Sequence, residues 1–410
     1  MSVTDPIATD LLTPLGAYLR LRAGARGAFL LESVERGRLG RYSFVGSGAR
    51  LVSFDEAEAL GEPVVGYLGY DAVVRFEPTV PLPADGPGLP ESLFVVPDVL
   101  VRFDHAHGIA ETLIGDADWA SRPQPLVPRG TGTPGPLERF PARDEHLLRV
   151  ARVKDYIREG DVFQVVIAQR ATRPTSASAV ELYRALRRVN PSPYLFLLEL
   201  GDLALVGSSP ETVVKCSGRR AELNPIAGTI SPGEGDAAAL LSSDKDRAEH
   251  TMLVDLGRND LSRVCLPGSV HVERFMQPER YSHVTHLVSE VVGELQEGVT
   301  PFELLRACFP AGTVSGAPKV RAMQIVSELE GYRRGIYAGA VGYFLPEANE
   351  LDTCIAIRTL WLRDGVAHLQ AGGGIVADSD PAAEHDECLA KLGALEAAIE
   401  LAESEQDAIP

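Results

Sequence analysis

Residues 335–379 hold three strand candidates in succession: GIYAGAVGYFLP (335–346), LDTCIAIRTLWLRD (351–364) and VAHLQAGGGIVADS (366–379). Short turns join them, and such turns connect antiparallel strands, whereas parallel strands need a long crossover. This stretch therefore predicts an antiparallel sheet.

Outward from this stretch, strands and helices come in mixed blocks. DVFQVVIAQRAT (161–172) reads as a strand, and helices are predicted over 144–160, 179–190, 237–264, 283–296, 301–309, 316–330 and 381–403. There is no regular strand–helix–strand alternation, so the pattern favours an α+β fold over a doubly wound one. Residues 1–115 read as short strands and turns. Residues 116–143 are rich in Pro and Gly without periodicity, which makes them the best candidate linker.

The composition restricts the possible functions. The chain has 410 residues, 45% of them hydrophobic, and a formal net charge of −18. A nucleic acid would be repelled by that charge. Five cysteines without a CxxC pair predict reduced thiols in a cytosolic protein. The N-terminus has no signal-peptide pattern, and no stretch approaches the roughly 20 apolar residues of a membrane span. We therefore expect a cytoplasmic protein that binds neither nucleic acid nor membrane.

Two predicted helices each carry a pair of carboxylates three residues apart. Asp246 and Glu249 form one pair, and Glu384 and Glu387, followed by Lys391, form the other. Residues spaced in this way share one helix face. If the pairs meet, four acids would repel one another unless a cation neutralised them, and hard oxygen ligands suit Mg²⁺. Taken singly, each pair is more simply a solvated face, and spacing alone does not decide the matter.

Three glycine-containing segments admit a binding or a structural interpretation. The amides of Gly372–Gly374 could approach an anion, or the run could form a β-bulge. NPIAGTI (224–230) and FPAGTVSGAPK (309–319) could each seat a carboxylate or form a turn.

Three single side chains are also candidates. His286 could be a general base, although a core histidine is the commoner case. Arg358 lies in an apolar run, so it must be paired, either with a bound carboxylate or with an internal acid. Glu211 is an acid within a similar strand-like segment.

These segments stand in a specific order along residues 145–400: DVFQVVIAQR, NPSPYLFLLEL, SSPE, PIAGT, AEHTMLVDLGRNDLSRV, SHVTHLVSEVVGEL, FPAGTVSGAPK, YAGAVGYF, LDTCIAIRT and GGGIVADSDPAAEHDECLAK. FLLESVE, RYSFVG, GYLGYDAVVRFEP and PDVLVRFDH extend the set toward the N-terminus. In this order the set resembles the chorismate-utilising enzymes, specifically those of the anthranilate synthase component I type.

The resemblance implies an antiparallel β-sandwich with helices packed outside. Residues 1–115 would form the N-terminal part of the sandwich, 116–143 a surface excursion, 144–403 the chorismate-binding catalytic part and 404–410 a C-terminal tail.

The resemblance also implies roles for the candidate residues. Mg²⁺ would be held by Glu249 and Glu387, and through water by Asp246, where the family usually has Glu, and by Glu384. The carboxylates of chorismate would be bound by the metal and by protein groups from Tyr337, Arg358, Lys391 and the amides of Gly372, Gly373 and Gly374. Gly228 and Thr229 would line the same pocket. Glu211 matches the family's general acid, which protonates the departing C4 hydroxyl, and His286 matches the histidine associated with loss of pyruvate.

Two positions discriminate between the family's reactions. Gln164 stands where relatives that add water have a lysine base, and an amide cannot take a proton from water at neutral pH. Ala227 stands where the aminodeoxychorismate synthases have a nucleophilic lysine, so no covalent intermediate can form. Direct attack by ammonia at C2 remains. GTISPG (228–233) replaces the common GTRPRG, which removes two arginines near the mouth of the site.

Two further segments match the family's tryptophan feedback pocket. Glu32 and Ser33 of LLES would meet the amine of the ligand, and Pro193, Tyr194 and Leu195 of NPSPYL would pack its indole. A strand end and a turn are the structural alternative.

The resemblance therefore predicts Mg²⁺-dependent synthesis of anthranilate from chorismate and ammonia with release of pyruvate, the first step of tryptophan biosynthesis, inhibited by tryptophan. The chain shows no glutaminase motif, so ammonia would come from solution or from a separate glutamine amidotransferase subunit. The alternatives are an enzyme that stops at 2-amino-2-deoxyisochorismate and a non-catalytic tryptophan-binding paralogue.

Overall fold

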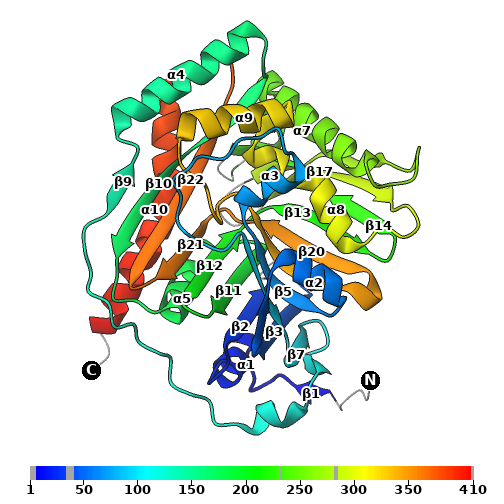
Figure 1. The fold of residues 1–410 in the computed structure, drawn as a ribbon, viewed down its shortest axis with the longest axis vertical. Coiled ribbons are helices and arrows are strands. Elements are labelled where there is room, and N and C mark those ends of the chain that lie inside the picture. The colour runs from blue at the N-terminus through cyan, green and yellow to red at the C-terminus, as the bar shows by residue number, and fades with distance from the viewer. Residues whose placement is uncertain (1–5, 34–40, 231–232, 234, 281–284, 408–410) are drawn as a thin grey trace.

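The computed structural model describes residues 6–33, 41–230, 233, 235–280 and 285–407, apart from the side chains at 229, 245, 406 and 407. In this part of the chain the strands pair antiparallel in two sheets, with helices outside them (Figure 1). The predicted α+β sandwich is confirmed.

The first sheet contains twelve strands in the described residues. Its spatial order is β1 (Ile7–Ala8), β8 (Ile109–Ile114), β7 (Val99–Asp104), β3 (Tyr42–Gly48), β2 (Gly27–Glu32), β11 (Tyr194–Leu200), β12 (Leu203–Ser209), β21 (Thr359–Arg363), β22 (Val366–Ile375), β10 (Gln164–Pro174) and β18 (Gly316–Ala317), with β9 (Glu138–Phe140) paired to β10.

The second sheet contains ten strands in the same described part of the chain. Its order is β15 (Ile226–Ile230), β17 (Thr285–Glu294), β14 (Arg220–Leu223), β13 (Thr212–Ser217), β20 (Glu350–Ile355), β19 (Ala340–Leu345), β5 (Val64–Leu68), β6 (Ser92–Val96) and β4 (Arg50–Val52), with β16 (His271–Arg280) paired to β17.

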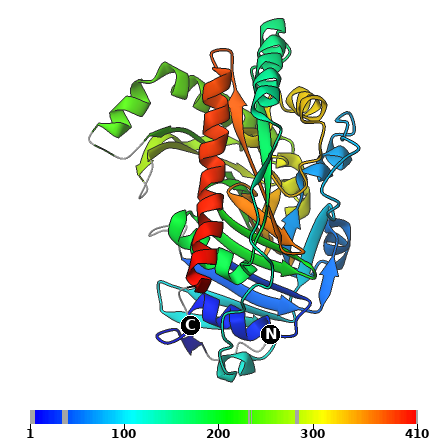
Figure 2. The ribbon, with the colours of Figure 1, turned by 90° about the vertical axis from the view of Figure 1, so that its left-hand side faces the viewer.

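The helices cover the outer faces of the sandwich. They are α1 (Pro14–Leu21), α2 (Phe54–Leu60), α3 (Val73–Phe76), α4 (Arg143–Glu159), α5 (Ala179–Val189), α6 (Asp236–Ser242), α7 (Asp244–Ser262), α8 (Pro301–Cys308), α9 (Lys319–Glu330) and α10 (Pro381–Asp407), with short 3₁₀ turns η1 (Tyr70–Ala72), η2 (Ala117–Ser121), η3 (Gly312–Val314) and η4 (Pro346–Ala348). The long helix α10 runs along the first sheet and packs on β22, α5 and α4 (Figure 2).

Burial of apolar side chains holds the layers together. Phe29 and Phe196 of the first sheet meet Tyr67 and Val341 of the second in a fully buried cluster between the sheets. A second cluster joins the outer face of the first sheet to α1, α5 and α10. Each large side chain removed from water in this way contributes roughly 1.5–3 kcal/mol.

One predicted helix is wrong. Residues 285–294 of the expected helix 283–296 form β17, and 283 and 284 lie outside the described residues. Leu287, Val288, Val291 and Val292 are all buried, so a strand with both faces covered imitates the apolar spacing of a helix. The β-branched residues favoured the strand.

The middle strand candidate, 351–364, is two strands in different sheets. β20 ends at Ile355 in the second sheet, and β21 begins at Thr359 in the first. The chain crosses between the sheets at 356–358, and Arg358 takes a left-handed φ of 49° there. This crossing fixes the position of Arg358.

The ends of the predicted segments also differ from expectation. Residues 1–115 contain α1, α2 and α3 in addition to strands, and α2 begins with a capping box formed by Ser53 and Glu56. α10 continues to Asp407, so the helix takes up residues 404–407 of the expected tail, and 408–410 lie outside the described residues. Residues 122–137 run without helix or strand and lead into β9 on the first sheet.

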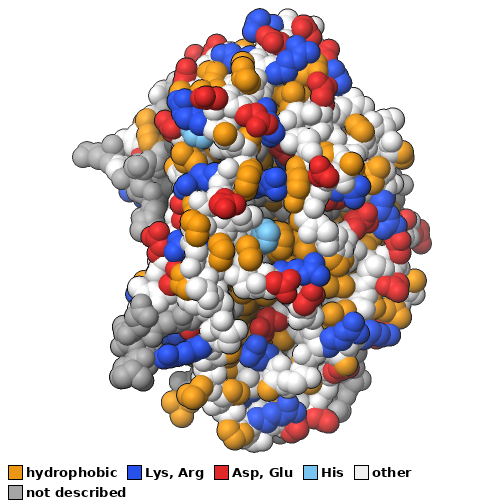
Figure 3. Space-filling view, turned by 60° about the vertical axis from the view of Figure 1, so that its left-hand side comes forward, with side chains coloured by type: hydrophobic (Ala, Val, Ile, Leu, Met, Phe, Trp, Pro, Cys, Tyr) orange, Lys and Arg blue, Asp and Glu red, His pale blue; other side chains and the backbone are white. Residues whose placement is uncertain are grey.

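The outer surface carries acidic, basic and apolar side chains side by side on the face shown in Figure 3. Leu126, in the irregular 122–137 segment, is 92% exposed. None of the described helices combines the length and the apolar run that crossing a membrane requires.

Candidate active site

The glycine run Gly372–Gly374 of β22 is the point where several of the candidate residues meet, among them Gln164, Tyr337, Glu384 and Glu387. A methyl group at Gly374 would lie 2.7 Å from Gln164 Nε2 on β10. A methyl group at Gly373, which faces the other side of the strand, would lie 3.0 Å from Glu384 Oε2 on α10. A methyl group at either position would push the end of the Gln164 or Glu384 side chain out of its present place.

Helix α7 brings the first acid pair to this strand. The helix begins after Ser243, whose hydroxyl accepts a hydrogen bond from the Asp246 amide (3.2 Å). Glu249 accepts a hydrogen bond from Gln164 Nε2 (2.9 Å). Asp246 lies beside β15, where a methyl group at Gly228 would be 3.5 Å from its carboxyl carbon. Both acids are half-buried, so this pair is not a fully solvated helix face.

Helix α10 brings the second pair. Ser379, just before the helix, donates a hydrogen bond to Glu384 Oε1 (2.6 Å). Lys391 Nζ lies 2.6 Å from Glu387 Oε1 and donates to the Gly372 carbonyl (2.8 Å). Glu387 remains 52% exposed, so it stands at the solvent side of the site.

The two pairs are separated by the glycine run and by Gln164. Glu249 reaches the run through its bond to Gln164, and Glu387 Oε1 is 4.0 Å from where a methyl group at Gly373 would be. The donor chemistry, carboxylate oxygens from two helices, suits Mg²⁺. Among the described residues, however, no three acids, histidines or cysteines lie close enough together to hold a metal ion. The acids form two pairs, each held by its own hydrogen-bond donor.

Arg358 and Tyr337 lie beside the same run. A methyl group at Gly372 would be 2.8 Å from the Tyr337 hydroxyl. Burial lowers the pKa of Arg358, and Tyr337 and Glu387 are near enough to oppose that shift. Among the described residues the Arg358 guanidinium makes no hydrogen bond or ion pair, so its donors are available to a bound anion.

Glu211 is a buried acid that is neutral at pH 7. It lies between β12 and β13, and burial raises its pKa to about 8, which the Thr313 hydroxyl of η3 only partly offsets. Glu211, Thr313 and Asp260 line one small pocket. A carboxyl group in this state can donate a proton. FPAGTVSGAPK thus forms η3 and β18 and places Thr313 beside the acid.

His286 and Gly228 come together across β17 and β15. The carbonyl of Gly228 accepts a hydrogen bond from His286 Nδ1 (2.9 Å), so in the neutral ring Nε2 is the basic nitrogen. Burial lowers the pKa of His286, with Arg358 acting in the same direction. Gly228 has a φ of 67° at a bulge in β15. The side chain of Thr229 and residues 231 and 232 of GTISPG lie outside the described residues.

The LLES and NPSPYL segments share a second pocket of about 190 Å³, between the two sheets. Glu32, Ser33, Tyr194 and Leu195 line it, whereas Pro193, buried just before β11, does not. The Ser33 hydroxyl is buried and makes no hydrogen bond within the described residues.

Contacts from this second pocket reach the residue next to Glu211. Glu32 forms an ion pair with Arg187 (3.3 Å). The Tyr194 hydroxyl contacts Thr212 Oγ1 (2.8 Å), and Thr212 directly follows Glu211. A ligand that moved Tyr194 would therefore act on the backbone of the buried acid.

A buried ion pair that sequence reasoning missed supports the site. Arg334 Nη2 lies 2.6 Å from Glu330 Oε1 and also donates to the Val166 carbonyl of β10 (2.8 Å), while Glu330 accepts from the Ala168 amide (2.9 Å). The Val166 carbonyl and the Ala168 amide lie on one edge of β10, between the residues that pair with β18 and those that pair with β9. Arg334 Nη1 donates to the Val314 carbonyl of η3 (2.8 Å). The i, i+4 spacing of Glu330 and Arg334 was the available signal.

Comparison with known proteins agrees with the fold and the motifs. A family model described as chorismate binding enzyme matches residues 24–397. Anthranilate synthase component 1 of Thermus thermophilus is 43% identical, with 96% of this chain and 97% of that protein covered. The protein of the same name from Streptomyces coelicolor is 42% identical, with 96% and 88% covered.

Solved structures agree as well. The crystal structure of anthranilate synthase component I from Streptococcus pneumoniae superposes with a TM-score of 0.79 at 32% identity and covers 96% of this chain and 99% of that one. The menaquinone-specific isochorismate synthase of Escherichia coli has a TM-score of 0.77 at 21% identity, with 96% and 93% covered, and shares the fold.

Proposed function

The chain belongs to the family of chorismate binding enzymes, and from this premise we propose that it makes anthranilate from chorismate and ammonia with release of pyruvate. The observation that carries the proposal is the glycine run of β22, around which both acid-bearing helices, Lys391 and Tyr337 are gathered. Such a cradle offers cations and backbone amides to a small dicarboxylic acid.

Substrate binding would use the groups around that run. Arg358 and Lys391 would each take a carboxylate oxygen of chorismate, and the amides of Gly372–Gly374 would add neutral donors. Glu249 and Glu387 would hold Mg²⁺ directly, with Asp246 and Glu384 acting through water. A divalent ion held there would neutralise the acids and supply a positive charge for a substrate carboxylate.

Glu211 would act as the general acid. Because it is protonated at pH 7, it can give its proton to the C4 hydroxyl as ammonia forms a bond to C2 and the C4–O bond breaks with loss of water. Loss of pyruvate then gives the aromatic ring. His286, held by the Gly228 carbonyl through Nδ1, would present Nε2 for proton transfer in that second step.

Gln164 supports amination rather than hydration. Its amide nitrogen donates to Glu249, and a carboxamide cannot activate a water molecule as a base. Ala227 offers no nucleophile for a covalent intermediate. An enzyme that stops at 2-amino-2-deoxyisochorismate is the nearest rival, and the placement of His286 beside Gly228 favours the complete reaction.

Tryptophan is the proposed inhibitor, bound in the pocket lined by Glu32, Ser33, Tyr194 and Leu195. Glu32 and the Ser33 hydroxyl, which makes no hydrogen bond to any described residue, suit an ammonium group, and Tyr194 offers a ring face to an indole. The contact from Tyr194 to Thr212, next to Glu211, supplies a physical route for inhibition. A tryptophan-binding paralogue without activity would need this pocket but not the neutral Glu211.

The relatives are named as component 1 of their enzyme, which supports a second component as partner. We propose a glutamine amidotransferase subunit in that role, supplying ammonia, in a cytoplasmic enzyme of tryptophan biosynthesis.

The decisive experiment incubates the purified chain with chorismate, Mg²⁺ and ammonium and follows the fluorescence of anthranilate, with and without tryptophan. Anthranilate formation that needs Mg²⁺ and falls with tryptophan is expected. Consumption of chorismate without fluorescence would favour the aminated intermediate as product. Tight binding of tryptophan without turnover would favour the non-catalytic alternative.

A further inference from the structure

Lys154 of α4 contacts the turn that leads from β22 into α10, just before the second acid pair. Its Nζ donates a hydrogen bond to the Ser379 carbonyl (2.5 Å). Among the described residues Lys154 makes no other hydrogen bond and no ion pair. Within that part of the chain, its charged donor is therefore directed at a single backbone carbonyl.

The turn at residues 376–380 is closed through Ser379. The Ser379 amide donates to the Val376 carbonyl (3.1 Å), and the Val376 amide donates to the Ser379 hydroxyl (3.0 Å). Ser379 is only 3% exposed, so a bond lost here is poorly replaced by water. Its carbonyl accepts the bond from Lys154, which means that the amide, the hydroxyl and the carbonyl of Ser379 all have partners.

The Ser379 hydroxyl links this turn to Glu384. It donates a hydrogen bond to Glu384 Oε1 (2.6 Å). The other carboxylate oxygen, Oε2, would lie 3.0 Å from a methyl group at Gly373, so it is directed at the glycine run. The contacts from Lys154 to Ser379 and from Ser379 to Glu384 thus connect α4 with the glycine run.

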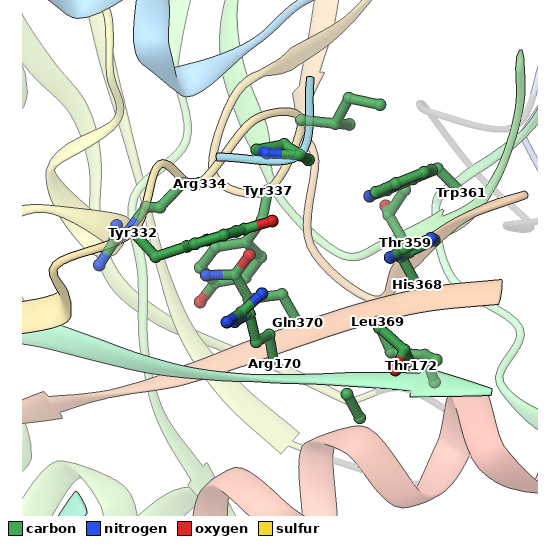
Figure 4. A pocket seen from close by; sticks show the side chains of 13 residues that line it. Arg170, Thr172, Tyr332, Arg334, Tyr337, Thr359, Trp361, His368, Leu369 and Gln370 are labelled. Carbon is green, nitrogen blue, oxygen red and sulfur yellow. The ribbon is translucent and has the colours of Figure 1, made fainter. Parts of the chain in front are cut away.

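Glu384 approaches β22 from the side that α10 covers. Side chains alternate between the two faces of a strand, so Gly373 and Gln370 belong to opposite faces. Figure 4 shows Gln370 on the side of Tyr337, with α10 across the strand. The position of Glu384 against Gly373 is therefore set on the helix side of the sheet, by the turn that Lys154 contacts.

Helix α4 gives Lys154 a fixed base. Val150 and Val153 of this helix are fully buried and belong to one apolar cluster with Ile375, the last residue of β22. Ile375 directly precedes the turn, so the same cluster anchors both partners of the Lys154 bond. Helix α4 also packs on α10.

We propose that Lys154 is a positioning residue, which fixes Ser379 and through it directs the Glu384 carboxylate at the glycine run. Its effect on turnover rests on the proposed function, in which Glu384 acts on Mg²⁺ through water, whereas its effect on the turn does not. Removal of the ammonium group should loosen the turn and leave the groups proposed to touch chorismate unchanged.

Hydrogen exchange of the turn tests this chain of contacts without turnover. Lys154→Met keeps the apolar stem and loses the donor, so the amides of residues 376–384 should exchange about tenfold faster, as expected for the loss of one charge-assisted bond. Lys154→Arg, which keeps a charged donor, should restore part of the protection. The matched control is Arg158→Met on the same helix, at a side chain that is 72% exposed and paired with Asp155. The control should exchange as the parent does.

A double-mutant cycle tests whether Lys154 acts through Ser379. The probe is Mn²⁺ alone, in place of Mg²⁺, with the free ion measured by electron paramagnetic resonance. Lys154→Met and Ser379→Ala should each weaken Mn²⁺ binding about three- to tenfold, and the double variant should bind no more weakly than Ser379→Ala. In turnover, the Mg²⁺ concentration for half-maximal rate should rise in Lys154→Met, while the KM for chorismate at saturating Mg²⁺ stays unchanged.

Two results would overturn the assignment. One is equal exchange of residues 376–384 in the parent and in Lys154→Met. The other is a set of losses in Mn²⁺ affinity that add in the double variant, because Lys154 would then act independently of Ser379. A parent chain that binds no Mn²⁺ would contradict the metal assignment of the proposed function, and exchange at the turn would then decide the role of Lys154 by itself.

Discussion

Replacing Glu211 with glutamine should stabilise the folded protein at neutral pH and abolish its activity. Burial raises the pKa of Glu211 from its usual value near 4.5 to about 8. Between these values the folded chain keeps a proton that the unfolded chain has released, so the wild-type free energy of unfolding falls as pH rises through this window. Glutamine has nearly the same shape and does not ionise, so the variant escapes that loss.

The size of the effect follows from the shift. One pKa unit corresponds to about 1.4 kcal/mol, so raising the pH from about 5 to about 7.5 should cost the wild type roughly 3 kcal/mol that the variant keeps. Asp260 in the same pocket also has a pKa raised by burial and is paired with Lys319 at 2.7 Å. Asp260 and Lys319 are unchanged in the variant, so their contribution cancels in the difference between the two chains.

The assay is urea unfolding of both chains across this pH range, together with anthranilate formation from ammonium. Glu62→Gln, at a surface ion pair with Arg50, serves as the control for loss of one carboxylate. The stability difference between Glu211→Gln and wild type should widen with pH. A difference that stays constant with pH would refute the buried neutral acid, and retained turnover would refute its catalytic role.

Three further predictions test other parts of the site. Glu387→Gln should abolish Mg²⁺-dependent turnover and leave the melting temperature within a few degrees of the parent, and an unchanged dependence of rate on Mg²⁺ would contradict the metal assignment. Ser33→Ala should raise the tryptophan concentration for half-inhibition about three- to tenfold through the loss of one hydrogen bond, and inhibition curves that superpose would argue against it. Gly374→Ala should lower kcat/KM by at least about tenfold, because its methyl group would lie 2.7 Å from Gln164 Nε2, which holds Glu249. Gly393→Ala on α10, where a methyl group meets nothing within 4 Å, should leave activity intact and add up to about 1 kcal/mol of stability, and equal losses in both variants would refute the packing argument.

Local sequence patterns predicted most of the helices and strands. The helices at 144–160 and 179–190 appear as α4 and α5 within a few residues, because capping and turn residues mark their ends. The pattern failed over 283–296, where β17 is covered on both faces and so lacks the alternation that identifies a strand. The sequence pattern also missed the switch of sheets at 356–358, because the spacing of hydrophobic residues does not depend on which strand is the partner.

The order of motifs along the chain settled the family and the α+β class, because residues that are close in sequence form each motif. Spacing also placed Asp246 with Glu249, and Glu384 with Glu387, each pair on one helix face. Only the tertiary structure decided that the N-terminal turns of both helices lie near the same glycine run and that burial raises the pKa of Glu211. Those properties depend on distance through space and on exclusion of water, and a linear sequence contains neither.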